Sequence, residues 1–186
     1  DGQLRTVATD GHRLAICDLE KSVSVSSDRQ LIVPRKGVLE MVRMLGDSED
    51  EVELAIGKNH IRLVRGRTIL TSKLIDGRFP DYRRVLPRNG DKIFQTSKDE
   101  LKQVLSRASI LSNEKFRGIR FTLDDGMVGI QANNPEQEEA HEEVSVNYQG
   151  DSLEMGFNVS YLIEVLGVLR SEQVNITLSD SNSSAL

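Results

Sequence analysis

The feature that most constrains this chain is a pattern of apolar residues that occurs three times. In each copy, apolar residues recur at i, i+3, i+4 and i+7, the spacing that places them on one face of an α-helix. The sets are Val38, Met41, Val42 and Leu45; Leu101, Val104, Leu105 and Ala108; and Leu162, Val165, Leu166 and Leu169. Leu101 lies 63 positions after Val38, and Leu162 lies 61 positions after Leu101. This regularity predicts one supersecondary unit that is used repeatedly.

Short apolar strands flank each predicted helix. The strands that precede the helices are residues 31–33, 93–94 and 155–157. After each helix, apolar and polar residues alternate as in a strand with one buried face, in runs that begin at Val52, Ile119 and Val174. Turn-forming residues then separate neighbouring strands, at Gly57-Lys58-Asn59 and at Asp124-Asp125-Gly126. Helices combined with such hairpins predict an α+β fold class.

A longer period organises these units into domains. Two turn-forming tetrads, Ala8-Thr9-Asp10-Gly11 and Ala132-Asn133-Asn134-Pro135, each follow an apolar strand, and their alanines lie 124 positions apart. That period is the size of a domain made of two similar halves. We predict two domains, residues 1–91 and 92–186, and we expect both to be incomplete. Residues 1–18 form a hairpin with no helix before it, so the polypeptide is expected to be a fragment.

The segment Gly77–Pro87 joins the two predicted domains and is both apolar and rich in arginine. Pro80 and Pro87 lack amide donors and restrict the residues before them to extended geometry, which disfavours a helix or a central strand. We therefore expect an extended connector. Its apolar side chains would form one wall of a groove, as connectors between domains commonly do; they are Phe79, Tyr82, Val85 and Leu86.

Composition narrows the classes of function. The chain has 186 residues, of which 38% are hydrophobic and 4% aromatic, so its core must consist mainly of Val, Ile and Leu. Cys17 is the one cysteine, which excludes a disulfide framework and a cysteine-based zinc site and fits a reducing, cytoplasmic compartment. The apolar runs are shorter than a membrane span. A net charge of -5 argues against tight nucleic-acid binding by the surface as a whole, although it leaves room for a local basic face.

Six segments, in this order along the chain, resemble the β subunit of bacterial DNA polymerase III, the sliding-clamp family. They are residues 8–15, 33–37, 76–87, 111–118, 133–140 and 156–161. The resemblance runs through nearly the whole chain. It implies a DNA clamp fold in which strand-helix-strand units repeat, with helices on the inner face of a ring and antiparallel sheets outside. It also implies that the N-terminal domain and the C-terminal end of the family are absent.

The same resemblance implies a processivity subunit without catalytic activity, cofactor or metal. Family members close head to tail as homodimers around duplex DNA without reading its sequence. A pocket on the ring then binds short peptide motifs of the DNA polymerase III catalytic subunit, the clamp loader and repair polymerases. Since the first domain is missing, this fragment is expected to be monomeric. No membrane partner is implied.

Residue by residue, the resemblance assigns three surfaces. The peptide-binding pocket comprises Thr9, Gly11, His12, Arg13, Leu14, Pro80, Val85 and Ser184. The DNA-facing residues are Arg35, Lys36, Arg43, Lys102 and Arg107. The dimer interface contains Ile110, Leu111, Glu136, Glu138 and Glu139.

Each surface also has a plainer interpretation from the residues alone. Thr9–His12 is a tight turn with an exposed histidine, Ile110 and Leu111 extend an apolar helix face into the core, and the acidic run around Glu139 is a solvated edge. Lys36 and Arg43 are two turns apart on a helix face that is net positive, which is also what an ordinary solvated face looks like. The third predicted helix offers no basic face.

Two other classes of function compete with a clamp. An enzyme could use Asp10 and His12 as an acid–base pair, and Glu138, Glu139 and His141 could ligate a hard metal ion. The sequence lacks a nucleophile elbow, a phosphate-binding loop and a cysteine pair, which disfavours catalysis. A peptide-binding adaptor that never encircles DNA would share every pocket residue. Retention on circular but not on linear DNA separates a clamp from such an adaptor.

Overall fold

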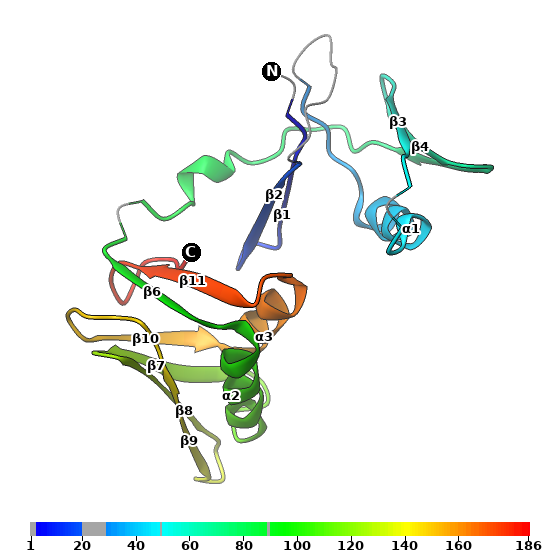
Figure 1. Cartoon of the computed structure of the whole chain (residues 1–186). Helices are drawn as coiled ribbons and strands as arrows, with labels where there is room; N and C mark the ends of the chain where they lie inside the picture. Colours follow the sequence, from blue (N-terminus) through cyan, green and yellow to red (C-terminus); the bar gives the residue numbers. More distant parts are fainter. Residues whose placement is uncertain (1–2, 20–28, 49, 89) are drawn as a thin grey trace. The chain divides into compact units, whose positions relative to one another are not determined.

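The computed structural model describes residues 3–19, 29–48, 50–88 and 90–186, and Figure 1 labels their helices and strands. The chain divides into two compact units, Asp1–Asp81 and Tyr82–Leu186. The sequence predicted a boundary after residue 91, which places residues 82–91 in the first domain. In the structure, residues 82–91 belong to the second compact unit.

The first unit contains a hairpin, a three-stranded sheet and one helix within its described residues. In chain order these are β1 (Arg5–Thr9), β2 (Leu14–Asp18), α1 (Arg35–Leu45), β3 (Glu53–Ile56), β4 (His60–Arg65) and β5 (Thr68–Lys73). The predicted hairpin is confirmed: β1 and β2 pair antiparallel from Arg5–Asp18 to Thr9–Leu14. Residues 1–2 of the predicted hairpin segment lie outside the described residues. The three-stranded sheet has the order β3-β4-β5, and Ile61 and Leu63 of β4 are its buried apolar residues.

Helix α1 packs by a different face from the one that its periodicity predicts. Val38 and Val42 are 44% and 61% exposed, so their prediction as core residues is wrong. Gly37 is buried instead, and a Cβ on it would lie 2.5 Å from Ser72 Oγ of β5. Because glycine has no Cβ, the helix backbone can approach the sheet closely at this point. Within the described part of this unit α1 is the only helix, so no second helix covers its apolar stripe.

The strand predicted at residues 31–33 is not formed. Ile75 N donates to Ile32 O (2.9 Å), but among the described residues the segment does not continue into a ladder. A strand needs a succession of such bonds, which apolar character alone does not supply.

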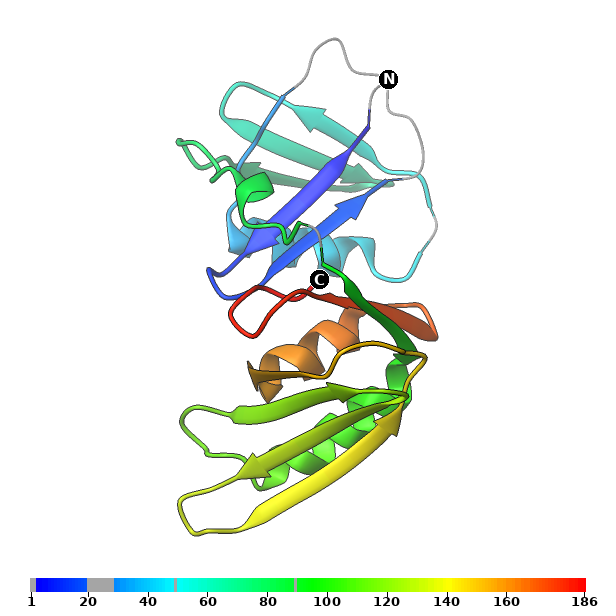
Figure 2. The same cartoon turned by 90° about the vertical axis from the view of Figure 1, so that its left-hand side faces the viewer.

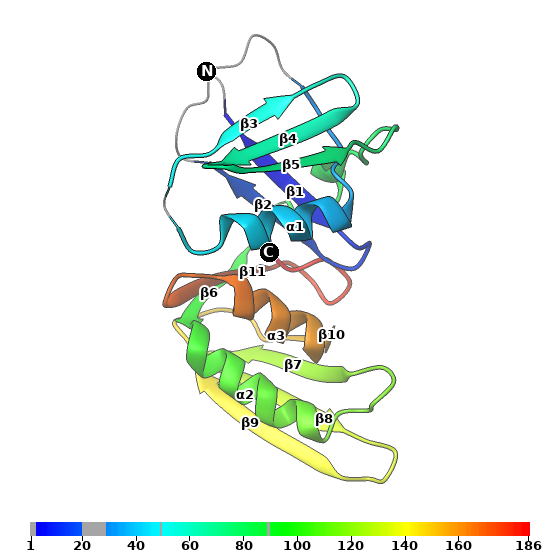
Figure 3. The ribbon, with the colours of Figure 1, turned by 90° about the vertical axis from the view of Figure 1, so that its right-hand side faces the viewer.

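The second unit contains the larger core. Its elements are the 3-10 turn η1 (Tyr82–Arg84), β6 (Lys92–Ser97), α2 (Lys98–Ile110), β7 (Gly118–Asp124), β8 (Met127–Asn133), β9 (Glu139–Ser145), β10 (Leu153–Asn158), α3 (Val159–Val168) and β11 (Gln173–Leu178). Four strands form an antiparallel sheet in the order β10-β7-β8-β9, and β6 pairs with β11. Figures 2 and 3 view this unit from opposite sides and show α2 and α3 on the same face of the four-stranded sheet. The predicted α+β class is therefore confirmed.

Helix α2 supplies the centre of this core. Its predicted stripe is fully buried, since Leu101, Val104, Leu105 and Ala108 are each at most 3% exposed. The alternating residues of β7 meet it from the sheet, and Phe121 of β7 contacts the ring of Phe157 edge-on at a centroid distance of 5.5 Å. Ser97 caps α2, because its Oγ accepts a hydrogen bond from Glu100 N (3.4 Å).

Helix α3 buries less of its predicted stripe. Leu166 and the first residue, Val159, are buried, whereas Val165 and Leu169 are 42% and 40% exposed. The helix is apolar on several sides, so periodicity alone does not fix which side faces the core. Among the described helices, none is long and apolar enough to cross a membrane.

The connector contains a single 3-10 turn, Tyr82–Arg84, which corrects the prediction of a fully extended segment. Val85 N donates to Tyr82 O (3.1 Å) and closes the turn. Pro80 and Pro87 lie outside the three turn residues, so neither proline removes a donor that the turn requires.

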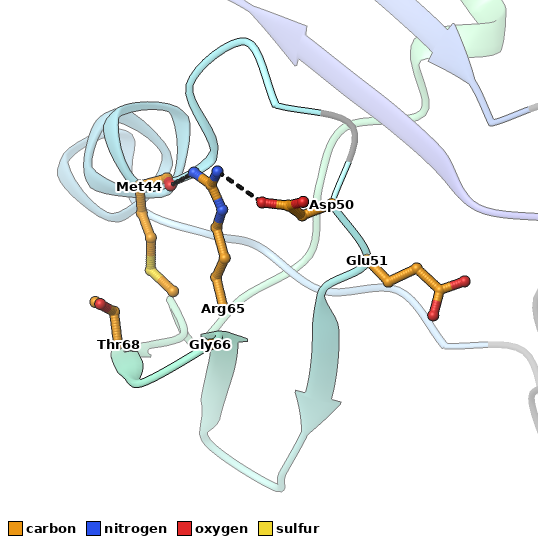
Figure 4. Close-up of a pocket in the computed structure, with 6 residues that line it drawn as sticks. All are labelled: Met44, Asp50, Glu51, Arg65, Gly66 and Thr68. Carbon is orange, nitrogen blue, oxygen red and sulfur yellow. Dashed lines mark hydrogen bonds and ion pairs between the residues drawn. The ribbon is translucent and has the colours of Figure 1, made fainter.

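Arg65 of β4 caps the C-terminus of α1 (Figure 4). Its Nη1 donates to Met44 O (2.6 Å) and to Leu45 O (2.8 Å), and its Nη2 pairs with Asp50 Oδ2 (3.1 Å). The last carbonyls of a helix lack partners within the helix and favour a cation. A surface pocket of about 460 Å³ surrounds this guanidinium, lined also by Glu51, Gly66 and Thr68. Since the arginine donors are engaged by the helix end and Asp50, we interpret the pocket as the space beside a structural cap.

This cap predicts the effect of replacing Arg65. Arg65→Met should destabilise the first unit by about 1 to 3 kcal/mol, because charge-assisted hydrogen bonds to helix carbonyls are lost. Arg62→Met, at an exposed position of the same strand, should change the free energy of unfolding much less. Urea unfolding of both variants measures the difference, and equal stabilities would contradict the proposed cap.

Candidate functional site

The tip of the β1–β2 hairpin brings together five of the predicted pocket residues: Thr9, Gly11, His12, Arg13 and Leu14. Asp10 organises this tip. Its Oδ1 accepts hydrogen bonds from His12 N and Arg13 N (both 3.0 Å), and its Oδ2 pairs with Arg13 Nε (3.1 Å). Thr9 Oγ1 donates to Arg13 O (2.8 Å) and accepts from Gly11 N (3.1 Å). Gly11 has φ +88°, a conformation that favours glycine. The turn is therefore rigidly built although it is exposed.

The environment of Asp10 stabilises its charged form. Backbone hydrogen bonds from Arg13 and His12, followed by the bond and charge of the Arg13 guanidinium, lower the pKa of Asp10 to about 2. The carboxylate is thus committed to the turn and to Arg13. This engagement disfavours the acid–base pair of Asp10 and His12 that an enzyme would need. Within the described ranges, no three His, Cys, Asp or Glu side chains are grouped so that they could hold a metal ion.

The remaining pocket residues lie outside the hairpin. Leu14 is half-buried at the first position of β2, and Pro80 is exposed near the end of the first unit. Val85 and Ser184 belong to the second unit; both are exposed, Val85 by 62%.

Two segments of the second unit converge on Thr177 of β11. Leu186, two residues beyond Ser184, exchanges a pair of backbone hydrogen bonds with Thr177, at 2.7 and 3.0 Å. Gly90, which follows the turn that holds Val85, lies so close to Thr177 that a Cβ would overlap its Cγ2. The connector and the C-terminal segment are thus both fixed to the same residue of the same strand. Sequence analysis did not single out Gly90 or Thr177.

Ser184 follows a turn that an aspartate organises. Asp180 Oδ1 accepts from Asn182 N (2.9 Å), and its Oδ2 accepts from Ser183 Oγ (2.8 Å). These hydrogen bonds lower the pKa of Asp180, and the bond from the Ser183 hydroxyl contributes most. An Asx turn of this kind was predictable from the Asp180-Ser181-Asn182 sequence.

The predicted DNA-facing residues of the first unit lie on α1. Arg35 and Lys36 are exposed in its first turn, and Arg43 lies in its last turn. The Arg43 side chain is 72% exposed and pairs with Glu40 Oε1 through Nη1 (2.6 Å). Exposed pairs at this spacing are weak and salt-sensitive, so the guanidinium stays accessible to another anion.

Of the two predicted DNA-facing residues of α2, Arg107 is paired within the second unit and Lys102 lies beside α3. Arg107 forms a bidentate pair with Glu142 of β9, with both N–O distances 2.7 Å. This hydrogen bonding raises the pKa of Arg107 and lowers the pKa of Glu142. Lys102 is half-buried and lies beside Gly167 of α3. If Gly167 carried a Cβ, that atom would be 3.4 Å from Lys102 Nζ. Sequence reasoning missed the Glu142 partner because its strand is far from α2 in the chain.

The end of α2 carries the predicted interface residues Ile110 and Leu111. Ile110 is 76% exposed and Leu111 is half-buried, so the plainer interpretation of Ile110 as a core residue is wrong. The loop that follows exposes Phe116 by 66%, which the sequence did not reveal. Asn158 fixes this loop to α3: its Nδ2 donates to Phe116 O (3.2 Å), while its Oδ1 accepts from Ser160 N (3.0 Å). The apolar groups are therefore held in an ordered loop.

The acidic run divides into a turn and two faces of β9. Glu136 and Glu138 lie in an exposed turn, where Asn134 Nδ2 donates to Glu138 Oε2 (2.6 Å). Along β9, Glu139 and Glu143 are exposed, whereas Glu142 alternates to the side that meets Arg107. The alternation removes Glu142 from the exposed acidic edge.

Comparison with known proteins identifies the family. The family model described as "DNA polymerase III beta subunit, central domain" matches residues 1–81, and the model described as "DNA polymerase III beta subunit, C-terminal domain" matches residues 83–186. The chain belongs to the bacterial DNA polymerase III β-subunit family, the sliding clamps.

Individual β subunits agree with this assignment. The beta sliding clamp of Pseudomonas aeruginosa is 58% identical over 185 residues, which cover 100% of this chain and 50% of that protein. The Escherichia coli K12 clamp is 54% identical over 182 residues, again over 50% of its length. The chain thus spans about half the length of these relatives.

Solved β-subunit structures share the fold. A crystal structure of the DNA polymerase III β subunit from P. aeruginosa superposes with a TM-score of 0.96 at 58% identity, covering 100% of this chain and 51% of that one. A clamp from Bartonella birtlesii bound to griselimycin superposes with a TM-score of 0.91 at 36% identity, covering 98% of this chain and 50% of that one. The predicted clamp fold is therefore confirmed for this chain.

The Asp10 turn predicts a specific acid response. Because the folded-state pKa is lowered from 3.8 to about 2, Asp10 stabilises the fold above pH 4 and loses this contribution as pH falls through about 2. Asp10→Asn should flatten that part of the dependence of unfolding free energy on pH. An NMR titration of the Asp10 carboxyl should give a midpoint near 2, and a midpoint near 3.8 would contradict the turn geometry.

Proposed function

We propose that this chain is the central and C-terminal part of a sliding clamp that encircles duplex DNA and tethers replication and repair proteins to it. The observation that carries this proposal is the match of both units, in order, to successive domains of one family at 58% identity. The function would be non-catalytic, in the bacterial cytoplasm, and would confer processivity on DNA polymerase III.

Partner binding would occur at a pocket formed by the hairpin tip, Pro80, Val85 and Ser184. The support is chemical: Leu14, Pro80 and Val85 offer apolar contact, and Arg13 offers an aliphatic stem with a positive charge. Clamps from P. aeruginosa and B. birtlesii bind griselimycin, as the descriptions of their structures state. We propose that the same ligand, and short peptide motifs of the polymerase catalytic subunit, clamp loader and repair polymerases, bind this pocket.

The ring would close through the end of α2. An exposed isoleucine beside an ordered loop is suited to burial against a second subunit. The acidic turn with Glu136 and Glu138, and Glu139 at the start of β9, would add electrostatic complementarity that sets orientation more than affinity. Full-length subunits would form a homodimer, whereas this chain alone would be monomeric or weakly associated.

DNA contact would use Arg35, Lys36 and Arg43 of α1 together with Lys102 and Arg107 of α2. Phosphate contacts of this kind are blind to sequence and weaken with salt, which suits a ring that holds DNA by enclosure. A peptide-binding adaptor is the second candidate, because it needs the pocket alone. A clamp would be retained on circular but not on linear DNA, whereas an adaptor would show no such difference.

The pocket is tested by Leu14→Ala in a full-length clamp that contains these residues. Loss of this apolar contact should weaken griselimycin binding by roughly 1 to 3 kcal/mol, the usual scale for an interface contact. Ile69→Ala, which shortens a more exposed apolar side chain on β5, is the control and should bind normally. Unchanged affinity in Leu14→Ala, measured by calorimetry, would remove Leu14 from the pocket.

The DNA-facing assignment is tested by charge reversal on α1. Lys36→Glu with Arg43→Glu should lower the amount of full-length clamp retained on nicked circular DNA, since two phosphate contacts become repulsive. Griselimycin affinity should stay the same. A control with Lys58→Glu and Arg67→Glu changes the net charge equally on the β3–β4 and β4–β5 turns. If both double variants were retained on DNA to the same extent, the charges on α1 would contribute no more to retention than charges elsewhere on the surface.

A further inference from the structure

Gly90 lies against β11 more closely than any other residue type would allow. A Cβ on Gly90 would overlap Thr177 Cγ2 and lie 3.1 Å from Leu178 O. The overlapping atom is a methyl group on a β-branched side chain of a paired strand, and Leu178 O belongs to the strand backbone, so an added Cβ would have to displace one or both. By contrast, a Cβ on Gly118 or Gly156, in the strands β7 and β10 of the same unit, would meet no atom within 4 Å. Gly90 thus differs from these two glycines, and it shares with Gly150, whose Cβ would lie 2.7 Å from Tyr148 Oη, a site that has no room for a side chain.

Thr177 is also the anchor of the C-terminal segment. Thr177 N donates to Leu186 O (2.7 Å), and Leu186 N donates to Thr177 O (3.0 Å). On its other side β11 pairs with β6, where Thr177 lies opposite Ile93. The strand is thus held in the unit by a regular ladder, so a segment that packs against Thr177 takes its position from the core.

Two hydrogen bonds hold the segment that carries Val85. Val85 ends the turn closed by its N–H and Tyr82 O (3.1 Å). Three residues later, Arg88 Nη2 donates back to Arg83 O (3.4 Å). These bonds hold the segment from Tyr82 to Arg88, and Gly90 contacts β11 two residues further along the chain.

We propose that Gly90 is a positioning residue for the peptide pocket. By lacking a Cβ, it lets the connector that carries Val85 lie directly on β11, the strand that also holds the segment carrying Ser184. The spacing of these two pocket walls would then depend on the contact between Gly90 and Thr177. This inference rests on the proposed peptide-binding function, because it assigns Gly90 a role through Val85 and Ser184.

The test is griselimycin affinity in a full-length clamp with Gly90→Ala. Forcing a methyl group against Thr177 should raise the dissociation constant on the order of 10-fold, by analogy with other over-packed contacts. Adding Thr177→Ser removes the Cγ2 methyl that the new Cβ meets, so the double variant should recover most of the affinity. Recovery is the decisive readout when it occurs at an unchanged free energy of unfolding, because it then traces the loss of affinity to the contact between position 90 and Thr177 and not to the stability of the unit.

Two controls separate the possible outcomes. Gly156→Ala has room for its Cβ and should bind griselimycin normally, and Val85→Ala should bind it more weakly. If Val85→Ala has no effect, the proposed pocket itself is wrong. If Val85→Ala weakens binding but Gly90→Ala does not, or if Thr177→Ser fails to restore Gly90→Ala, the pocket stands and the positioning role of Gly90 is overturned.

Discussion

The second unit depends on the burial of one face of α2 against the four-stranded sheet. Leu101, Leu105 and Ala108 are almost inaccessible to solvent, and burying a leucine side chain contributes about 2 kcal/mol. This packing fixes which sides of the helix remain outside. The same rotation that turns the leucines inward directs Arg107 toward β9 and leaves Ile110 at the surface. The proposed DNA and subunit contacts are therefore consequences of core packing.

Loops in both units are organised by short polar side chains more than by burial. Asp10, Asn113 and Asp180 each accept backbone N–H groups from two or three residues further along the chain. Such turns need no core, because each satisfies the donors that it exposes. Exposed segments can thus keep a defined shape. This explains how residues as accessible as His12 and Ser184 occupy fixed positions.

Local chemistry predicted much of this structure. The stripe of α2, the alternation of β7 and the hairpin turns depend on short-range patterns that the folded chain retains. The failures have physical causes. Val38 and Val42 of the α1 stripe are exposed because Gly37, a residue without an apolar side chain, makes the close contact with the sheet. Glu142, Asn158 and Thr177 were missed because their partners are distant in sequence, and no local pattern reports a contact that only tertiary folding creates.

On the proposed DNA-facing surface, the pairing of Arg107 with Glu142 would affect motion along a polyanion. A guanidinium that already has an internal carboxylate at 2.7 Å gains little when it exchanges that partner for an external one. Each encounter would then be nearly neutral in free energy and brief. A surface of such residues would present a smooth energy profile, over which a bound strand could advance without pausing at any one position.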